Sequence, residues 1–111
     1  MIVNGTDLSM MRGDSDGLIV SCVDGEIERP FADGDTVTLT IKTVVSDEIP
    51  ALKKSLTEFD DLGRAVFVFA PEDTRNMWPT DYIYDIQLET AGETITIIEP
   101  DTFTLRGDVT P

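Results

Sequence analysis

The stretch DYIYDIQLETAGETITIIEPDTFTLRGD, residues 81–108, contains three consecutive segments in which apolar and polar residues alternate. Only Ile83 interrupts the polar side of the first segment. Successive side chains of a strand point to opposite faces of a sheet, so this pattern predicts a three-stranded antiparallel meander with one buried face. The apolar positions of the three segments are Tyr82, Tyr84, Ile86 and Leu88, then Ile95 and Ile97, then Phe103 and Leu105.

Size and charge narrow the class of protein. The chain has 111 residues, of which 41% are hydrophobic, and we expect a single β-sandwich domain over residues 1–111. It carries 8 Lys and Arg against 22 Asp and Glu, for a net charge of −14. A charge this negative argues against nucleic acid and against anionic membranes as partners. It indicates a solvated acidic surface, while cation binding and docking to a basic partner remain open.

The single cysteine and the N-terminal sequence indicate where the chain folds. Cys22 cannot form an internal disulfide, and we expect it to pack as a small buried hydrophobe. The first residues lack the basic start and apolar run of a signal peptide, and no apolar stretch approaches the ~20 residues of a membrane span. We therefore expect a protein that is made and folded in a cytoplasm.

Gly-Asp and Asp-Gly pairs divide the chain into short segments. Such pairs favour turns, and their regular spacing predicts a sandwich or a barrel. Strands are expected at Asp7–Met11, at 18–23, at 36–43 and at Ala65–Phe69, the last as a central strand buried on both faces because it is apolar throughout.

Two segments have less regular patterns. Residues 48–59 fit either a helix or a strand, and their strand neighbours favour a strand. Pro71 followed by two acids predicts a short helical turn over 71–77. The total of seven or eight short strands in about 100 residues is typical of a β-sandwich.

Few residues of this chain are suited to catalysis. It contains no histidine, so it lacks the usual general base and the commonest metal ligand. The carboxylate pairs Asp60-Asp61 and Glu72-Asp73 are expected from the acidic composition alone. The segment 14–17 matches a calcium loop only loosely, and a turn is the favoured interpretation, although weak calcium binding by loop aspartates stays open. We expect no catalytic residue, no cofactor and no dedicated metal site.

Three aromatic residues and two tripeptides are candidates for interaction. Core packing is the favoured role for Tyr82 and Tyr84. Trp78 lies in an expected loop beside Pro79, where it either caps the core or contacts a partner. Together the three could also form a platform for a sugar. Arg-Gly-Asp occurs at 12–14 and at 106–108, and in both places a strand followed by a turn explains it.

Several motifs resemble small tail and baseplate proteins of phages and prophages of Gram-positive bacteria. Residues 7–15, DLSMMRGDS, resemble their opening strand and Gly-Asp turn, and residues 31–42, FADGDTVTLTIK, resemble a second Gly-Asp turn that leads into a Thr/Val strand. Residues 82–88, 94–97 and 103–110 resemble their closing hairpins. The resemblance covers most of the chain and includes the N-terminal domain of the baseplate upper protein.

This resemblance implies an immunoglobulin-like β-sandwich that associates with itself and with other virion proteins, as a homo-oligomer in the assembled virion. It implies no catalytic residues. The baseplate upper protein continues into segments that hold a receptor-binding protein, and no such role is carried over to this chain. The alternative function is a carbohydrate- or cell-surface-binding β-sandwich module that uses Trp78, Tyr82 or Tyr84.

Overall fold

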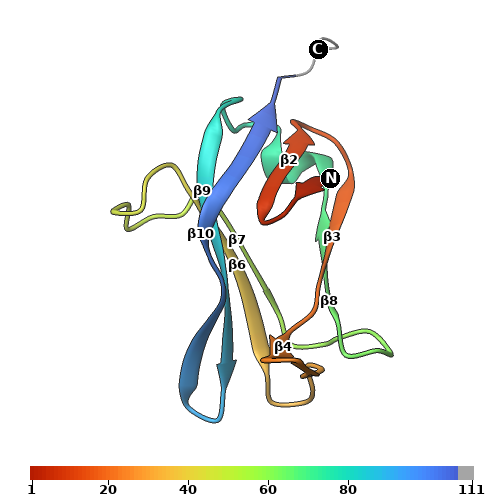
Figure 1. The fold of residues 1–111 in the computed structure, drawn as a ribbon. Coiled ribbons are helices and arrows are strands. Elements are labelled where there is room, and N and C mark those ends of the chain that lie inside the picture. Colours follow the sequence, from red (N-terminus) through yellow and green to blue (C-terminus); the bar gives the residue numbers. More distant parts are fainter. Residues whose placement is uncertain (108–111) are drawn as a thin grey trace.

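The computed structural model describes residues 1–107, which form an all-β, sandwich-like fold of two facing layers (Figure 1). The larger layer is a six-stranded sheet in the order β1-β2-β10-β9-β6-β7. All neighbours in it are antiparallel except β2 and β10, which run parallel. Its strands are β1 (Ile2–Asn4), β2 (Asp7–Met11), β6 (Thr36–Lys42), β7 (Leu52–Leu56), β9 (Asp81–Thr90) and β10 (Glu93–Arg106).

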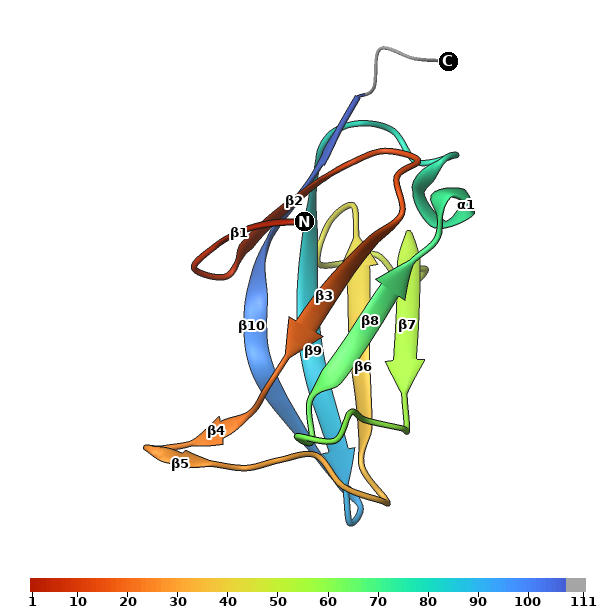
Figure 2. The same ribbon diagram turned by 90° about the vertical axis from the view of Figure 1, so that its right-hand side faces the viewer.

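The second layer consists of only two antiparallel strands, β3 (Asp16–Val20) and β8 (Ala65–Phe69). Figure 2 views the molecule from the side of this layer, with β3 and β8 crossing in front of the larger sheet. A separate small hairpin of β4 (Val23–Asp24) and β5 (Ile27–Glu28) extends from one end. The short helix α1 (Pro71–Thr74) follows β8 at the other end.

The core lies between the two layers. On β6, Val37, Leu39 and Ile41 have no exposed surface, while the threonines between them point outward. From the second layer, Phe67 and Phe69 of β8 pack against this face, and the Phe69 ring lies 6.4 Å from that of Phe103 on β10. Burial of large apolar side chains is the main driving force for folding, so this interface stabilises the sandwich.

The strand arrangement is that of an immunoglobulin-like sandwich. Strands β6, β9 and β10 correspond to C, F and G of one sheet, and β3 and β8 correspond to B and E of the other. At the start of β9 the Tyr82 hydroxyl donates a 2.7 Å hydrogen bond to the carbonyl oxygen of Trp78, which is the tyrosine corner of such domains. In the described residues, β3 and β8 have no further strand beside them, so the second sheet is narrower than usual.

The expected three-stranded meander is wrong in one respect: its second and third segments form the single strand β10. The chain continues through Pro100, and the pairing with β9 shifts register between Thr96 and Ile98 and again between Ile98 and Asp101. A proline cannot donate to a ladder and is tolerated at such bulges.

The other expected elements are confirmed with shifted limits. The strand predicted at 18–23 begins at Asp16 and ends at Val20. The strand favoured within 48–59 is β7, and the helical turn predicted at 71–77 is α1. The prediction of a doubly buried strand at Ala65–Phe69 is wrong, because Val66 and Val68 are exposed on a face that no residue among 1–107 covers. Within the described residues, no helix has the length and apolar character needed to cross a bilayer.

Gly63 is required where the 57–64 loop approaches the segment before β6. It has φ +70°, and a Cβ at this position would overlap the side chain of Pro30 and lie 3.1 Å from the carbonyl oxygen of Phe31. Gly25 also has a positive φ, +67°, but a Cβ built on Gly25 would have no neighbouring atom within 4 Å. Replacing each glycine by alanine therefore distinguishes the cost of backbone strain, which both share, from the cost of steric overlap, which only Gly63 has.

We predict that Gly63→Ala destabilises the protein clearly more than Gly25→Ala does. Both substitutions place an L side chain in the left-handed region, which costs about 1–2 kcal/mol, and only Gly63→Ala adds the overlap with Pro30. Chemical denaturation of the two variants measures the difference. Equal losses of stability would contradict the close approach of the two loops.

Candidate functional site

Trp78 is exposed at the end of the sandwich where α1 lies. Its side chain is 82% exposed, so of its two expected roles the structure excludes that of a core cap. Its main chain is fixed, because its carbonyl oxygen accepts the hydrogen bond from Tyr82. The indole is therefore held on a defined backbone and is available for contact.

Tyr82 and Tyr84 are core residues, as the favoured interpretation of the sequence predicted. They are 5% and 1% exposed. The Tyr84 hydroxyl donates to the carbonyl oxygen of Thr6, and burial raises the pKa of Tyr84 to about 12. Because both rings are buried, they do not join Trp78 in a surface platform for a sugar.

One member of each carboxylate pair, Asp60 and Asp73, has structural contacts. Asp60 accepts hydrogen bonds from the backbone and side chain of Arg64, which lower its pKa. Asp73 is bound to Lys54 at 2.9 Å and to the backbone N–H of Ala70, and both contacts lower its pKa. These carboxylates are fixed as anions that hold a loop and the start of α1, which leaves them poorly suited to acid–base catalysis.

The loosely calcium-like segment 14–17 also has internal partners. The Asp16 carboxylate contacts the amino group of Met1 and accepts a hydrogen bond from the N–H of Gly17. Across residues 1–107, no three acidic or sulfur side chains come together in a way that could hold a metal ion.

The first Arg-Gly-Asp forms the turn after β2, where the N–H of Gly13 donates to the buried hydroxyl of Thr74. The second Arg-Gly-Asp reaches Asp108, which lies outside the described residues.

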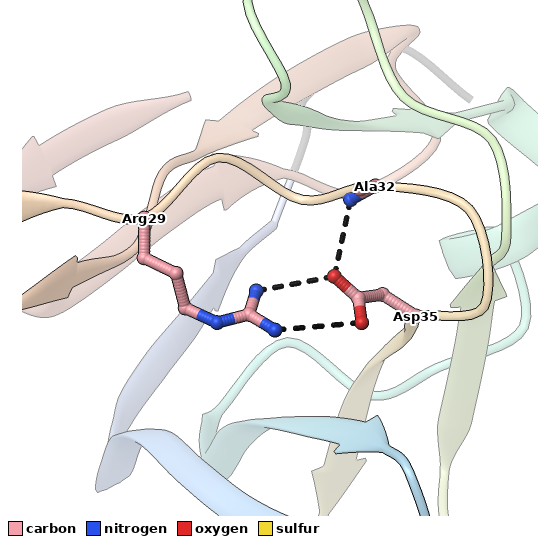
Figure 3. A network of polar contacts seen from close by, with 3 residues as sticks. All are labelled: Arg29, Ala32 and Asp35. Atoms are coloured by element: carbon pink, nitrogen blue, oxygen red, sulfur yellow. Dashed lines mark hydrogen bonds and ion pairs between the residues drawn. The ribbon is translucent and has the colours of Figure 1, made fainter.

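Asp35 is the one buried charged residue among residues 1–107, and the sequence analysis does not name it as a candidate (Figure 3). The two guanidinium nitrogens of Arg29 lie 3.1 and 3.5 Å from its carboxylate oxygens, and the N–H of Ala32 donates to the same group. The Arg29 guanidinium holds the pKa of Asp35 at about 2. The cluster closes the loop that leads into β6, and Arg29 and Ala32 both donate to Asp35, so its role is structural.

One surface hollow of about 320 Å³ lies between the β4 segment and the β9–β10 hairpin. Its charged lining residues are Asp24 and Arg29, and Arg29 is engaged with Asp35. Cys22 contributes to the lining and is half-buried rather than fully buried as expected. The hollow offers no set of convergent polar groups of the kind that orients a small-molecule substrate.

The outward side of the second layer carries a contiguous apolar surface. Ile19 of β3 is directly paired with Val66 of β8, and Val68 lies two residues farther along β8, opposite Gly17. The side chains of Ile19, Val66 and Val68 are 56%, 37% and 66% exposed. We call this surface, Ile19, Val66 and Val68 with Gly17, the association face. Neighbouring exposed apolar residues of this kind are typical of protein–protein contacts.

The association face lacks uncompensated charge. Among the ten residues of β3 and β8, only Asp16 is charged, and it contacts the amino group of Met1. The ends of β8 are flanked by two ion pairs, Arg64 with Asp60 and Lys54 with Asp73. In a protein with a net charge of −14, this face is a locally neutral region. The sequence signal of this face is that Ala65–Phe69 is apolar on both faces of the strand, a pattern that predicts burial of both, whereas one is exposed.

The two edges of the six-stranded sheet are unsuited to strand addition. β1 has only three residues, and β7 carries Lys53 and Lys54. Lys54 points inward, where its ammonium lies 5.7 Å from the centroid of the Phe69 ring. Short edges and inward-pointing charges are devices that prevent a sheet from pairing with another chain. The association face is therefore favoured over these edges as a contact surface.

No known protein-family model matches the chain, and a search of curated proteins finds no match.

We predict that Asp35→Asn destabilises the protein by about 2 kcal/mol at neutral pH. The reason is that Arg29 stabilises the Asp35 carboxylate in the folded protein, and this contact is absent from the unfolded chain. A carboxylate with a lowered pKa contributes stability above its unfolded pKa and loses it as the pH falls through its folded pKa. The difference between wild type and variant should thus be constant near neutrality and shrink as the pH falls from 3.8 to about 2.

Thermal and denaturant unfolding across this pH range measures the effect. Asp33→Asn, in the same turn but exposed, serves as the matched control and should change stability little. A difference for Asp35→Asn that stays constant down to pH 2 would exclude the Arg29 contact as its source.

Proposed function

We propose that this protein is a virion structural module of a phage or prophage, acting in the tail or baseplate by protein–protein association and without catalysis. The observation that carries the proposal is the exposed, neutral association face on a narrow second sheet. The core does not require it, since the inward side chains of β3 and β8 already cover the larger sheet. An apolar face of this kind is costly in isolation and is useful when a neighbouring protein covers it.

The sequence resemblance to small tail and baseplate proteins supports the virion setting. The segments that carry it are structural landmarks in this fold: residues 7–15 comprise β2 and its Gly-Asp turn, and residues 31–42 contain the Asp35 turn and β6. Self-association and contact with other virion proteins belong to the same proposal. The exposed Trp78, at the end of the sandwich, is a second candidate contact.

The carbohydrate-binding alternative loses two of its three residues. Tyr82 and Tyr84 are buried, which leaves Trp78 as the single exposed aromatic of the group. Sugar platforms depend on exposed aromatic faces together with polar partners that fix orientation. We therefore keep association as the proposed function.

The proposal predicts that the protein is a stoichiometric part of the particle encoded by the same genome. Particles induced from that genome, purified on a density gradient and analysed by quantitative mass spectrometry, should contain its peptides in a fixed ratio to tail proteins. Its amount should not fall on repeated gradient purification. A protein that remains in the soluble fraction, while tails form without it, would contradict the proposal.

A further inference from the structure

Negative charge is concentrated at the end of the sandwich from which the β4–β5 hairpin extends (Figure 2). Three segments meet there, residues 21–35, 57–64 and 89–94, and we call them the hairpin end. The N–H of Phe31 donates to the carbonyl oxygen of Gly63, and Gly34 lines one hollow together with the turn between β9 and β10. These segments hold ten acidic and two basic residues, which is more than half of the net charge in about a quarter of the chain.

Both cations of the hairpin end are already bound to carboxylates. Arg29 pairs with Asp35, and Arg64 pairs with Asp60. Eight exposed carboxylates remain there without an ion pair among residues 1–107: the four acids of residues 24–33 with Glu58, Asp61, Glu89 and Glu93. The other six Lys and Arg residues lie outside these segments. Such a concentration of one sign of charge attracts partners of the opposite sign.

The β4–β5 hairpin places an apolar side chain beside a carboxylate on each of its two faces. Val23 is paired with Glu28, and Asp24 is paired with Ile27. Directly opposed residues of an antiparallel pair share a face. Val23 is 56% exposed and Ile27 is 74% exposed, so the core does not account for them. Lys and Arg side chains pack their methylene stems on apolar surface and keep the charged head at a polar group. Each face is therefore complementary to a Lys or Arg side chain.

Two hollows flank β4 and repeat this combination of groups. The hollow of about 320 Å³ lies between β4 and the β9–β10 hairpin, and its lining includes Val23 and Asp24. A second hollow, of about 310 Å³, lies between β4 and residues 62–64, and its lining includes Val23 and Glu28. The cations that line them, Arg29 and Arg64, are held in their own ion pairs. Each hollow thus offers apolar surface and a carboxylate that has no ion pair within residues 1–107.

The chemistry of the hairpin end favours a protein over other occupants. Nucleic acids and anionic lipids are repelled by it, and no three acidic side chains within residues 1–107 are grouped to hold a metal ion. A second copy of the chain carries −14, and its cations are dispersed along the sequence, with Lys53-Lys54 as the one adjacent pair. Lys54 of that pair is bound to Asp73. A basic segment must therefore come from a different protein.

We propose that the hairpin end docks a basic segment of another protein. The stems of its Lys and Arg side chains pack against Val23 and Ile27, and their charged ends lie at Asp24 and Glu28. This is a second contact surface, separate from the association face. The proposal goes beyond the proposed function and does not depend on the virion setting, because it concerns the chemistry of this one surface. Contact between opposite charges weakens as salt is added.

Fluorescence anisotropy of a labelled peptide of alternating Lys and Arg, titrated with the whole chain, tests the proposal. We expect saturable binding that weakens as salt is raised. Val23→Thr combined with Ile27→Thr should weaken binding about tenfold, because apolar contact with the stems is lost while the charge is unchanged. Asp24→Asn combined with Glu28→Gln should weaken it by a similar factor. Threonine retains strand propensity, so the first variant keeps the hairpin.

Matched controls make the same chemical changes at exposed positions elsewhere. Val45→Thr with Ile49→Thr lies in the loop between β6 and β7, and Asp14→Asn with Glu72→Gln lies at the α1 end of the sandwich. The second control has the same net charge as the carboxylate variant, so it measures the effect of overall charge. Each control should change the affinity by less than about twofold.

Amide NMR shifts on addition of the peptide locate the contact and should change at residues 21–30, 62–64 and 95–97. Absence of binding at low salt would overturn the proposal. Equal losses in the test and control variants would overturn it too, since they would show attraction to overall charge alone, and so would shift changes confined to other segments. Sedimentation of the chain without peptide adds a last outcome: an oligomer abolished by Val23→Thr with Ile27→Thr would mean that a second copy occupies this end, contrary to the proposal.

Discussion

Burial of one face of a six-stranded sheet beneath only two strands is the constraint on which the rest of this structure depends. The inward residues of β6 and β9 need apolar cover, and β3 and β8 supply it through Phe67, Phe69 and their neighbours. With so few strands, each covering residue contributes a large share of the core, and large-to-small changes in such positions cost about 2–5 kcal/mol. The second layer must therefore hold its place without strands on either side.

Secondary contacts fix the ends of this narrow layer. The Lys54–Asp73 ion pair joins β7 to the helical turn after β8, and Arg64 with Asp60 closes the loop before β8. The tyrosine corner at Tyr82 and the Asp35 cluster fix the loops at opposite ends of the larger sheet. In the part of the chain that the structure describes, the ion pairs of Arg29, Lys54 and Arg64 thus position loops.

Local patterns in the sequence predicted the class of fold and much of the core. Alternation in β6 and β9 correctly predicted which side chains are buried, including Tyr82 and Tyr84, because period-two patterning reflects a sheet with one covered face. The expected division of the second and third segments into two strands was wrong, because β10 continues through Pro100, and a proline is accepted at a bulge. Local sequence does not reveal whether a partner strand continues on both sides of such a residue.

The candidate surface was missed for a similar reason. Val66 and Val68 lie in a strand that is apolar on both faces, which is typical of a central strand covered on both sides. Whether the second face is covered depends on how many layers the chain supplies, and the described residues supply two. The apolar outer residues are then available for intermolecular contact. Trp78 is likewise an exposed apolar residue, although it lies in a loop close to the buried Tyr82.

The association face should be covered by a neighbouring protein in the assembled state. Single cysteines introduced as Val68→Cys and, as a control, Val45→Cys, both in a Cys22→Ser background, allow maleimide labelling of the free protein and of the protein in purified virions. The account predicts that both positions react in dilute free protein, because both valines are exposed, and that position 68 becomes protected on assembly while position 45 stays reactive. Equal labelling of position 68 in the free and assembled protein would contradict it.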